Sequence, residues 1–113
     1  MQISDLLARV DAGGTPGAHD ITTALRPIYD GDEPVVAYFR MACDGTDIRA
    51  MGAAKALHEA VLPGWEWRLG PSNAKIYPYY GSPVKSWDGM ADNPARAWLL
   101  AILRALYAQE PDK

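Results

Sequence analysis

Hydrophobic residues recur at three- and four-residue steps in two long stretches, and this spacing predicts two amphipathic helices. The first covers residues 47–62 and is ended by a Pro-Gly pair. Its apolar stripe consists of Ile48, Met51, Ala54, Leu57, Val61 and Leu62. The second covers residues 94–108, with Asn93 as a favourable cap and Pro94 as a favourable first residue. Its stripe consists of Trp98, Leu99, Ile102, Leu103 and Leu106.

Two shorter helices are predicted nearer the N-terminus. Ser4 can cap the first, and its apolar side consists of Leu6, Leu7 and Val10. A Gly- and Pro-rich segment at residues 13–17 then separates it from the second helix. The second begins at about residue 18 or 20, and Pro27 limits its end.

Strict alternation of apolar and charged residues over 65–69 predicts a half-buried strand. The turn Gly-Pro-Ser-Asn follows, and a second strand up to residue 80 completes an antiparallel hairpin over about 65–80. Pro78 has no N–H to donate, so the second strand should be an edge strand or should end there. Residues 81–91, which contain glycine, proline and Trp87, are expected to form a loop.

Residues 35–41 are ambiguous, because seven residues are too few to distinguish a strand from a helix by period. Their β-branched and aromatic side chains favour a short third strand. The sequence therefore predicts a single α+β domain over residues 1–113, in which the helices 47–62 and 94–108 cover one face of a small antiparallel sheet. A two-stranded sheet is marginal alone, so either the segment 35–41 or a second copy of the chain in a homodimer should complete it.

Composition is that of an ordinary globular domain, with 49% apolar and 22% charged residues among 113. No run approaches the 18 apolar residues of a membrane span, and the charges near the N-terminus argue against a secretory signal. The single cysteine, Cys43, rules out an internal disulfide. These features lead us to expect a cytoplasmic protein without a membrane partner.

Charge is unevenly distributed along the chain. Residues 1–47 contain eight acids and three bases, a net −5, whereas the remainder has a net +2. The acids that we regard as candidates for binding a basic partner are Asp30, Asp32, Glu33, Asp44 and Asp47. The alternative is that these acids only keep the protein soluble. The overall net charge of −3 argues against direct binding of nucleic acid.

Aromatic residues are concentrated between residues 65 and 98. Trp65, Trp67 and Trp98 are expected to fill the core, because a small domain needs large buried side chains. If that face of the hairpin is covered, Tyr77 and Tyr79 lie on its outer face. Together with Trp87, these tyrosines are candidate protein-binding residues, and a small ligand is the alternative. The same side chains could stack single-stranded bases, but Glu66 and the overall negative charge weigh against that.

No catalytic residue, metal site or cofactor is predicted. Asp30, Asp32 and Glu33 concentrate carboxylates in one segment, but an ordered series of ligands does not follow, so a solvated loop is the better interpretation. His58 adjoins an apolar stripe and is expected at the surface or partly packed. Cys43 has no assignable base and is expected to be a buried apolar residue.

Two stretches, Ala54–Gly70 and Ala91–Leu106, carry a resemblance to a known group of proteins. They contain an alanine-rich helix, the unusual element Pro63-Gly64-Trp65-Glu66-Trp67 and a Pro-started last helix. Over roughly residues 46–108 the chain resembles small proteins of tailed phages and prophages that are similar to the phage ABA sandwich domain. The resemblance implies a phage or prophage origin and a small sheet flanked by helices, and it brings no catalytic residues.

The function that we expect is a non-enzymatic phage accessory protein that binds a host or phage protein in the bacterial cytoplasm. Counter-defence, including inhibition of a CRISPR effector (an anti-CRISPR activity), is the most natural subclass, because small acidic inhibitors can occupy basic nucleic-acid-binding surfaces. The alternatives are an enzyme or small-ligand-binding protein that uses the aromatic-rich hairpin, and a structural or DNA-linked phage component.

Overall fold

The computed structural model describes residues 2–26, 33–45, 48–78 and 86–109. Within these ranges the chain forms five helices and a three-stranded antiparallel sheet, so the predicted α+β class is confirmed. In chain order, the elements are α1 (Ile3–Asp11), α2 (Ala18–Leu25), α3 (Glu33–Asp44), α4 (Ile48–Val61), β1 (Glu66–Leu69), β2 (Asn73–Tyr77), β3 (Trp87–Met90) and α5 (Pro94–Ala108).

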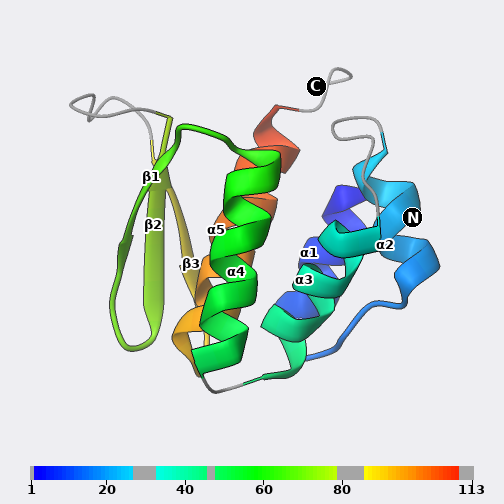
Figure 1. The fold of residues 1–113 in the computed structure, drawn as a ribbon, viewed down its shortest axis with the longest axis horizontal. Helices are drawn as coiled ribbons and strands as arrows, with labels where there is room; N and C mark the ends of the chain where they lie inside the picture. Colours follow the sequence, from blue (N-terminus) through cyan, green and yellow to red (C-terminus); the bar gives the residue numbers. More distant parts are fainter. Residues whose placement is uncertain (1, 27–32, 46–47, 79–85, 110–113) are drawn as a thin grey trace.

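The elements form three layers, with the sheet on one side, α4 and α5 in the middle, and α1, α2 and α3 on the far side (Figure 1). Helix α5 contacts both β2 and β3 in the sheet and α1, α3 and α4 among the helices. Because α5 has neighbours on several sides, apolar residues cover most of its surface rather than one stripe. Ten of its fifteen residues are buried, which makes it the centre of the core.

The two long helices and the hairpin agree with the sequence pattern. Helix α5 begins as predicted, since the side chain of Asn93 accepts a hydrogen bond of 2.9 Å from the backbone N–H of Arg96. Strand β1 pairs with β2 so that Trp67 lies opposite Ile76 on the face toward the helices. Glu66 lies opposite Tyr77 on the other face, as the hairpin predicts.

Residues 35–41 do not form a strand, so the predicted third strand is wrong: they belong to α3. The buried residues of α3 are Val35, Phe39, Ala42 and Cys43, and this spacing fits one helical face. Residues 35–41 alone are too short to show the helical spacing of the buried residues. It becomes visible only when Ala42 and Cys43 are included. Packing of this face against the rest of the core outweighs the strand preference of its β-branched and aromatic residues.

The third strand is instead β3, in the segment expected to be a loop. It pairs with β2, which is therefore the central strand, and β2 ends at Tyr77, immediately before Pro78. Gly89 allows β3 to lie directly on α5. A Cβ at this position would overlap the carbonyl oxygen of Ala97 and lie 2.7 Å from the backbone nitrogen of Ala101.

The short N-terminal helices α1 and α2 are confirmed, with one change at the first cap. Gln2, which has an extended backbone, precedes the first turn, and Ser4 lies inside the helix. The carboxylate of Asp5 accepts a hydrogen bond of 2.9 Å from the backbone N–H of Gln2. Gln2 rather than Ser4 is therefore the residue that caps the helix, and Asp5 is the partner of its backbone N–H.

Candidate interaction surface

One end of the molecule combines two clefts with exposed apolar side chains. Helices α1 and α3 end there, α4 and α5 begin there, and β1 and β3 run toward it (lower end in Figure 1). Helix ends leave backbone groups without intrahelical partners. At this end, side chains from segments far apart in the sequence can therefore hydrogen-bond to the free backbone groups of the helix ends.

The first cleft, which we call the acidic cleft, has a volume of about 400 Å³ and lies between the ends of α1 and α3 and the turn from β3 to α5. Three carboxylates line it, those of Asp11, Asp44 and Asp92, and Arg96 lies among them. These four groups carry a net formal charge of −2. Met90, with 70% of its surface exposed, forms part of the wall.

Arg96 uses its charge to hold the fold together at the base of the acidic cleft. Its Nη1 donates to the carbonyl oxygens of Val10 at 2.9 Å and Gly14 at 3.1 Å. Its Nη2 donates to the carbonyl oxygen of Cys43 at 2.5 Å. One guanidinium thus joins α5 to the end of α1, to the segment after it and to the end of α3, and the carbonyl of Val10 accepts from Gly13 N–H as well. Because its donors face these carbonyls, the carboxylates dominate the rim.

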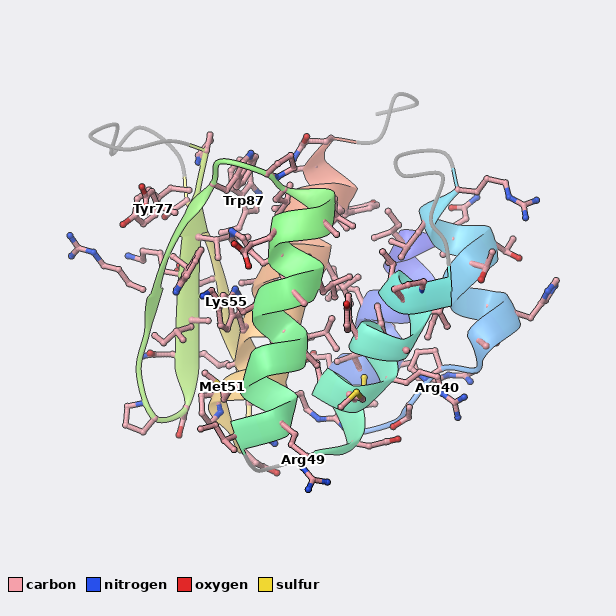
Figure 2. All side chains as sticks on the ribbon, viewed as in Figure 1. Arg40, Arg49, Met51, Lys55, Tyr77 and Trp87 are labelled. Carbon is pink, nitrogen blue, oxygen red and sulfur yellow. The ribbon has the colours of Figure 1, made fainter. Side chains whose placement is uncertain are left out.

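The second cleft, which we call the basic cleft, has a volume of about 290 Å³ and lies at the connection of α3 to α4. Arg40 of α3 and Arg49 of α4 line it together with Met41, Gly45 and Ala50. Figure 2 shows Arg49 at the beginning of α4 and Arg40 on α3 toward the same end. The cleft therefore presents two guanidinium groups from different helices.

Asp44 lines both clefts, so the acidic and basic clefts are neighbours. Its Oδ1 accepts a hydrogen bond of 2.6 Å from the hydroxyl of Thr15. This bond ties the end of α3 to the segment after α1. The ridge between the two clefts therefore has a defined conformation.

Two exposed methionines line these clefts, and Ile48 directly precedes Arg49 of the basic cleft in the sequence. Ile48 is 85% exposed at the start of α4, and Met41 and Met90 are 45% and 70% exposed. Ile48 was predicted in the buried stripe of its helix, and this prediction is wrong because the first turn of α4 extends past the core. Large apolar side chains gathered at one place on a surface are typical of interaction sites. We call the following set the junction surface: Asp11, Arg40, Met41, Asp44, Ile48, Arg49, Met90 and Asp92.

Three charges of the junction surface oppose the dipoles of their own helices. Asp11 and Asp44 are the last residues of α1 and α3, where the negative end of a helix disfavours a carboxylate. Arg49 is the second residue of α4, where the positive end disfavours a cation. The dipole of its own helix favours none of these charges, and Asp44 is held instead by its hydrogen bond from Thr15. Local rules of this kind are broken most often at functional sites.

Among the predicted site residues whose side chains the structure describes, Asp44 alone lies in the junction surface. Asp30, Asp32, Asp47 and Tyr79 lie outside the residues that the structure describes, as does the side chain of Glu33 at the start of α3. Tyr77 is on the outer face of the sheet, and Trp87 packs against Trp65 with ring centroids 5.5 Å apart. Both lie toward the opposite end of the molecule from Asp44 (Figure 2).

Sequence reasoning missed the arginines and the exposed apolar residues of the junction surface. Their meeting depends on the angle between α3 and α4, which no local pattern reports. One signal was available: charges that oppose a helix dipole can be recognised once the helix ends are known. With the helix ends of the structure, that signal marks Asp11 and Arg49.

His58 is buried, with 1% of its surface exposed, so the predicted surface or partly packed position is wrong. Trp98 Nε1–H donates to its Nδ1 at 3.1 Å, and its Nε2 lies 3.0 Å from the carbonyl oxygen of Trp65. Since indole only donates and a carbonyl only accepts, the ring must be neutral with its proton on Nε2. Trp67 packs edge-on against the ring at 4.9 Å. Both nitrogens therefore have structural partners.

Cys43 is buried as predicted, and burial raises the pKa of its thiol to about 11. A thiol with such a pKa remains protonated and is a poor nucleophile at neutral pH. Among the residues that the structure describes, no group of three His, Cys, Asp or Glu side chains is placed to hold a metal ion.

Comparisons of the chain with protein-family models, with curated proteins and with solved structures found no match. None of the helices in the described ranges is long and apolar enough to cross a membrane.

Proposed function

We propose that this protein is a non-enzymatic binding protein and that the junction surface contacts a protein partner carrying basic and apolar groups. The observation that carries the proposal is the exposure of Met41 and Met90 in two neighbouring clefts whose charged residues are mainly acidic in one and basic in the other.

The acidic cleft suits a lysine or arginine of the partner. Its three carboxylates outnumber its one guanidinium, and the donors of that guanidinium face backbone carbonyls. Met90 and Ile48 would then contact apolar residues next to the basic residue. Charge complementarity of this kind raises the association rate and selects the partner, while the apolar contacts slow dissociation.

The resemblance to phage and prophage proteins supports a role in the conflict between phage and bacterium. A basic, nucleic-acid-binding surface of a host defence protein has the chemistry that the acidic cleft fits. We therefore propose counter-defence, including inhibition of a CRISPR effector, as the biological role.

The binding proposal is tested by affinity capture from bacterial lysate with matched variants. We expect wild type and Lys55→Glu, a variant on the exposed side of α4, to retain the same partner. Met90→Glu and Asp11→Lys should lose it, because they remove the apolar and acidic contacts. A partner retained equally by all four proteins contradicts the proposal. A partner lost only with Tyr77→Ala would move the binding site to the outer face of the sheet.

The counter-defence role has a separate test. Bacteria with a CRISPR system that targets a phage are transformed to express this protein, and the efficiency of plating of that phage is measured. Wild type should restore plaque formation, whereas Asp11→Lys should not. If wild type leaves immunity unchanged against every CRISPR type tested, inhibition of these effectors is wrong, although binding to another protein remains testable by capture.

A further inference from the structure

We infer that the junction surface is self-complementary, and that a second copy of this chain occupies it in a two-fold symmetric dimer when no other partner is bound. This inference uses the charges and exposed side chains of the junction surface only. It does not rest on the identity of the partner in the proposed function.

The two clefts have opposite charge and share a wall. The acidic cleft carries the carboxylates of Asp11 and Asp92, and the basic cleft carries Arg40 and Arg49. A two-fold axis between neighbouring patches places each patch opposite the other patch of the second copy. Each acidic cleft then faces a basic cleft, and both charge contacts occur twice in one dimer.

The apolar residues of the junction surface lie where such a dimer needs them. Met41 borders the basic cleft and Met90 borders the acidic cleft, while Ile48 adjoins Arg49. Contact between two copies would remove all three side chains from water, which is the main favourable contribution to protein association. The charge pairs around them would set the orientation of the two copies.

Self-association would also regulate the proposed binding function. The partner and the second copy would use the same residues, so each would displace the other. Binding of a different protein would therefore separate the two copies and replace the dimer by a complex with that protein. Before it binds, the dimer would keep the apolar side chains of the junction surface covered. Only this regulatory consequence depends on the proposed function.

The dimer is tested with purified protein by sedimentation velocity over a wide range of concentrations. We expect the 12.3 kDa chain to form a species of twice that mass. Raising the salt concentration from about 0.05 to about 0.5 M should weaken the dimer by about tenfold or more, because exposed charge pairs are screened. A wild-type protein that remains monomeric at all concentrations overturns the inference.

Charge-reversal variants test the arrangement of the two copies. Arg40→Glu places an acid opposite the acidic cleft of the second copy, and Asp11→Lys places a base opposite the basic cleft, so each variant alone should be monomeric. In an equimolar mixture, the two variants can pair with each other. The changed basic cleft of Arg40→Glu then faces the changed acidic cleft of Asp11→Lys, and the other contact joins two unchanged clefts. Both contacts are then attractive, and the mixture should form heterodimers.

Lys55→Glu is the matched control, because it reverses a charge as Arg40→Glu does, but on the exposed side of α4 outside both clefts. It should dimerise like wild type. If it dissociates as much as Arg40→Glu, net charge rather than the junction surface controls association, and the inference is wrong. A mixture of Arg40→Glu and Asp11→Lys that stays monomeric overturns the two-fold pairing of the clefts. Circular dichroism checks that every variant is folded.

Discussion

Lowering the pH from about 7 to about 5 should destabilise the folded protein by up to about 2 kcal/mol through His58 alone. Burial lowers the pKa of this imidazole, although the hydrogen bond to the Trp65 carbonyl and the charges of Glu59 and Glu66 act in the opposite direction. Protonation would put an N–H on Nδ1, directly against the N–H of Trp98. The folded protein therefore resists a proton that the unfolded chain accepts.

The magnitude follows from the difference in proton binding. The unfolded histidine titrates at about 6.5. Below this pH the unfolded state binds the proton first, so stability falls at a limiting slope of about 1.4 kcal/mol per pH unit until the folded pKa is reached. Above the unfolded pKa the contribution of His58 is constant. Applied between the unfolded pKa and pH 5, this slope sets an upper limit of about 2 kcal/mol on the loss from His58.

The assay compares urea unfolding of wild type and His58→Gln across this pH range. Glutamine can accept from Trp98 and donate to the Trp65 carbonyl, but it does not titrate. The stability of wild type relative to His58→Gln should therefore decrease as the pH falls, while other titrating groups cancel. His19→Gln, at an exposed position of α2, is the matched control for the loss of a histidine. Parallel pH profiles for wild type and His58→Gln would show that the folded protein does not resist protonation of His58.

Three other substitutions test the packing, each measured by urea unfolding. Gly89→Ala should destabilise by about 2 kcal/mol or more, because the new methyl group overlaps the backbone of α5 at Ala97; a neutral result would mean that β3 does not lie on α5. Arg96→Leu should cost about 2–4 kcal/mol, since the carbonyls of Gly14 and Cys43 lose this donor and that of Val10 keeps only the N–H of Gly13, and a loss below about 0.5 kcal/mol would contradict its role. Leu103→Ala should cost about 2–5 kcal/mol, as expected for a fully buried leucine, and a smaller loss would show that the site is not tightly packed.

The elements with a long or strict pattern were predictable from the sequence. Helix α5 has a capping Asn93, a first-turn proline and fifteen residues over which the apolar period repeats. The hairpin combines strict alternation with a turn of typical composition. In both elements, local preference and tertiary packing favour the same structure, so the local pattern is sufficient.

The missed elements are those in which tertiary contacts outweigh local preference. In α3, Val35 and Phe39 favour a strand locally but become buried on one face of a helix. In β3, Gly89 favours a loop by its local preference. The structure requires a glycine there because α5 lies directly against the strand, and the strand's own sequence does not show this contact. The junction surface was missed for a similar reason, since Arg40 and Arg49 meet only when α3 and α4 pack together.

The position of α5 in the chain has a consequence for synthesis on the ribosome. Every other helix and strand that the structure describes precedes α5 in the sequence, and five of them contact it. During translation, α1 and the sheet therefore leave the exit tunnel before the helix that covers their apolar faces. Arg96 likewise reaches back 86 residues to Val10. The nascent chain must hold these faces exposed, or shielded by a chaperone, until α5 emerges.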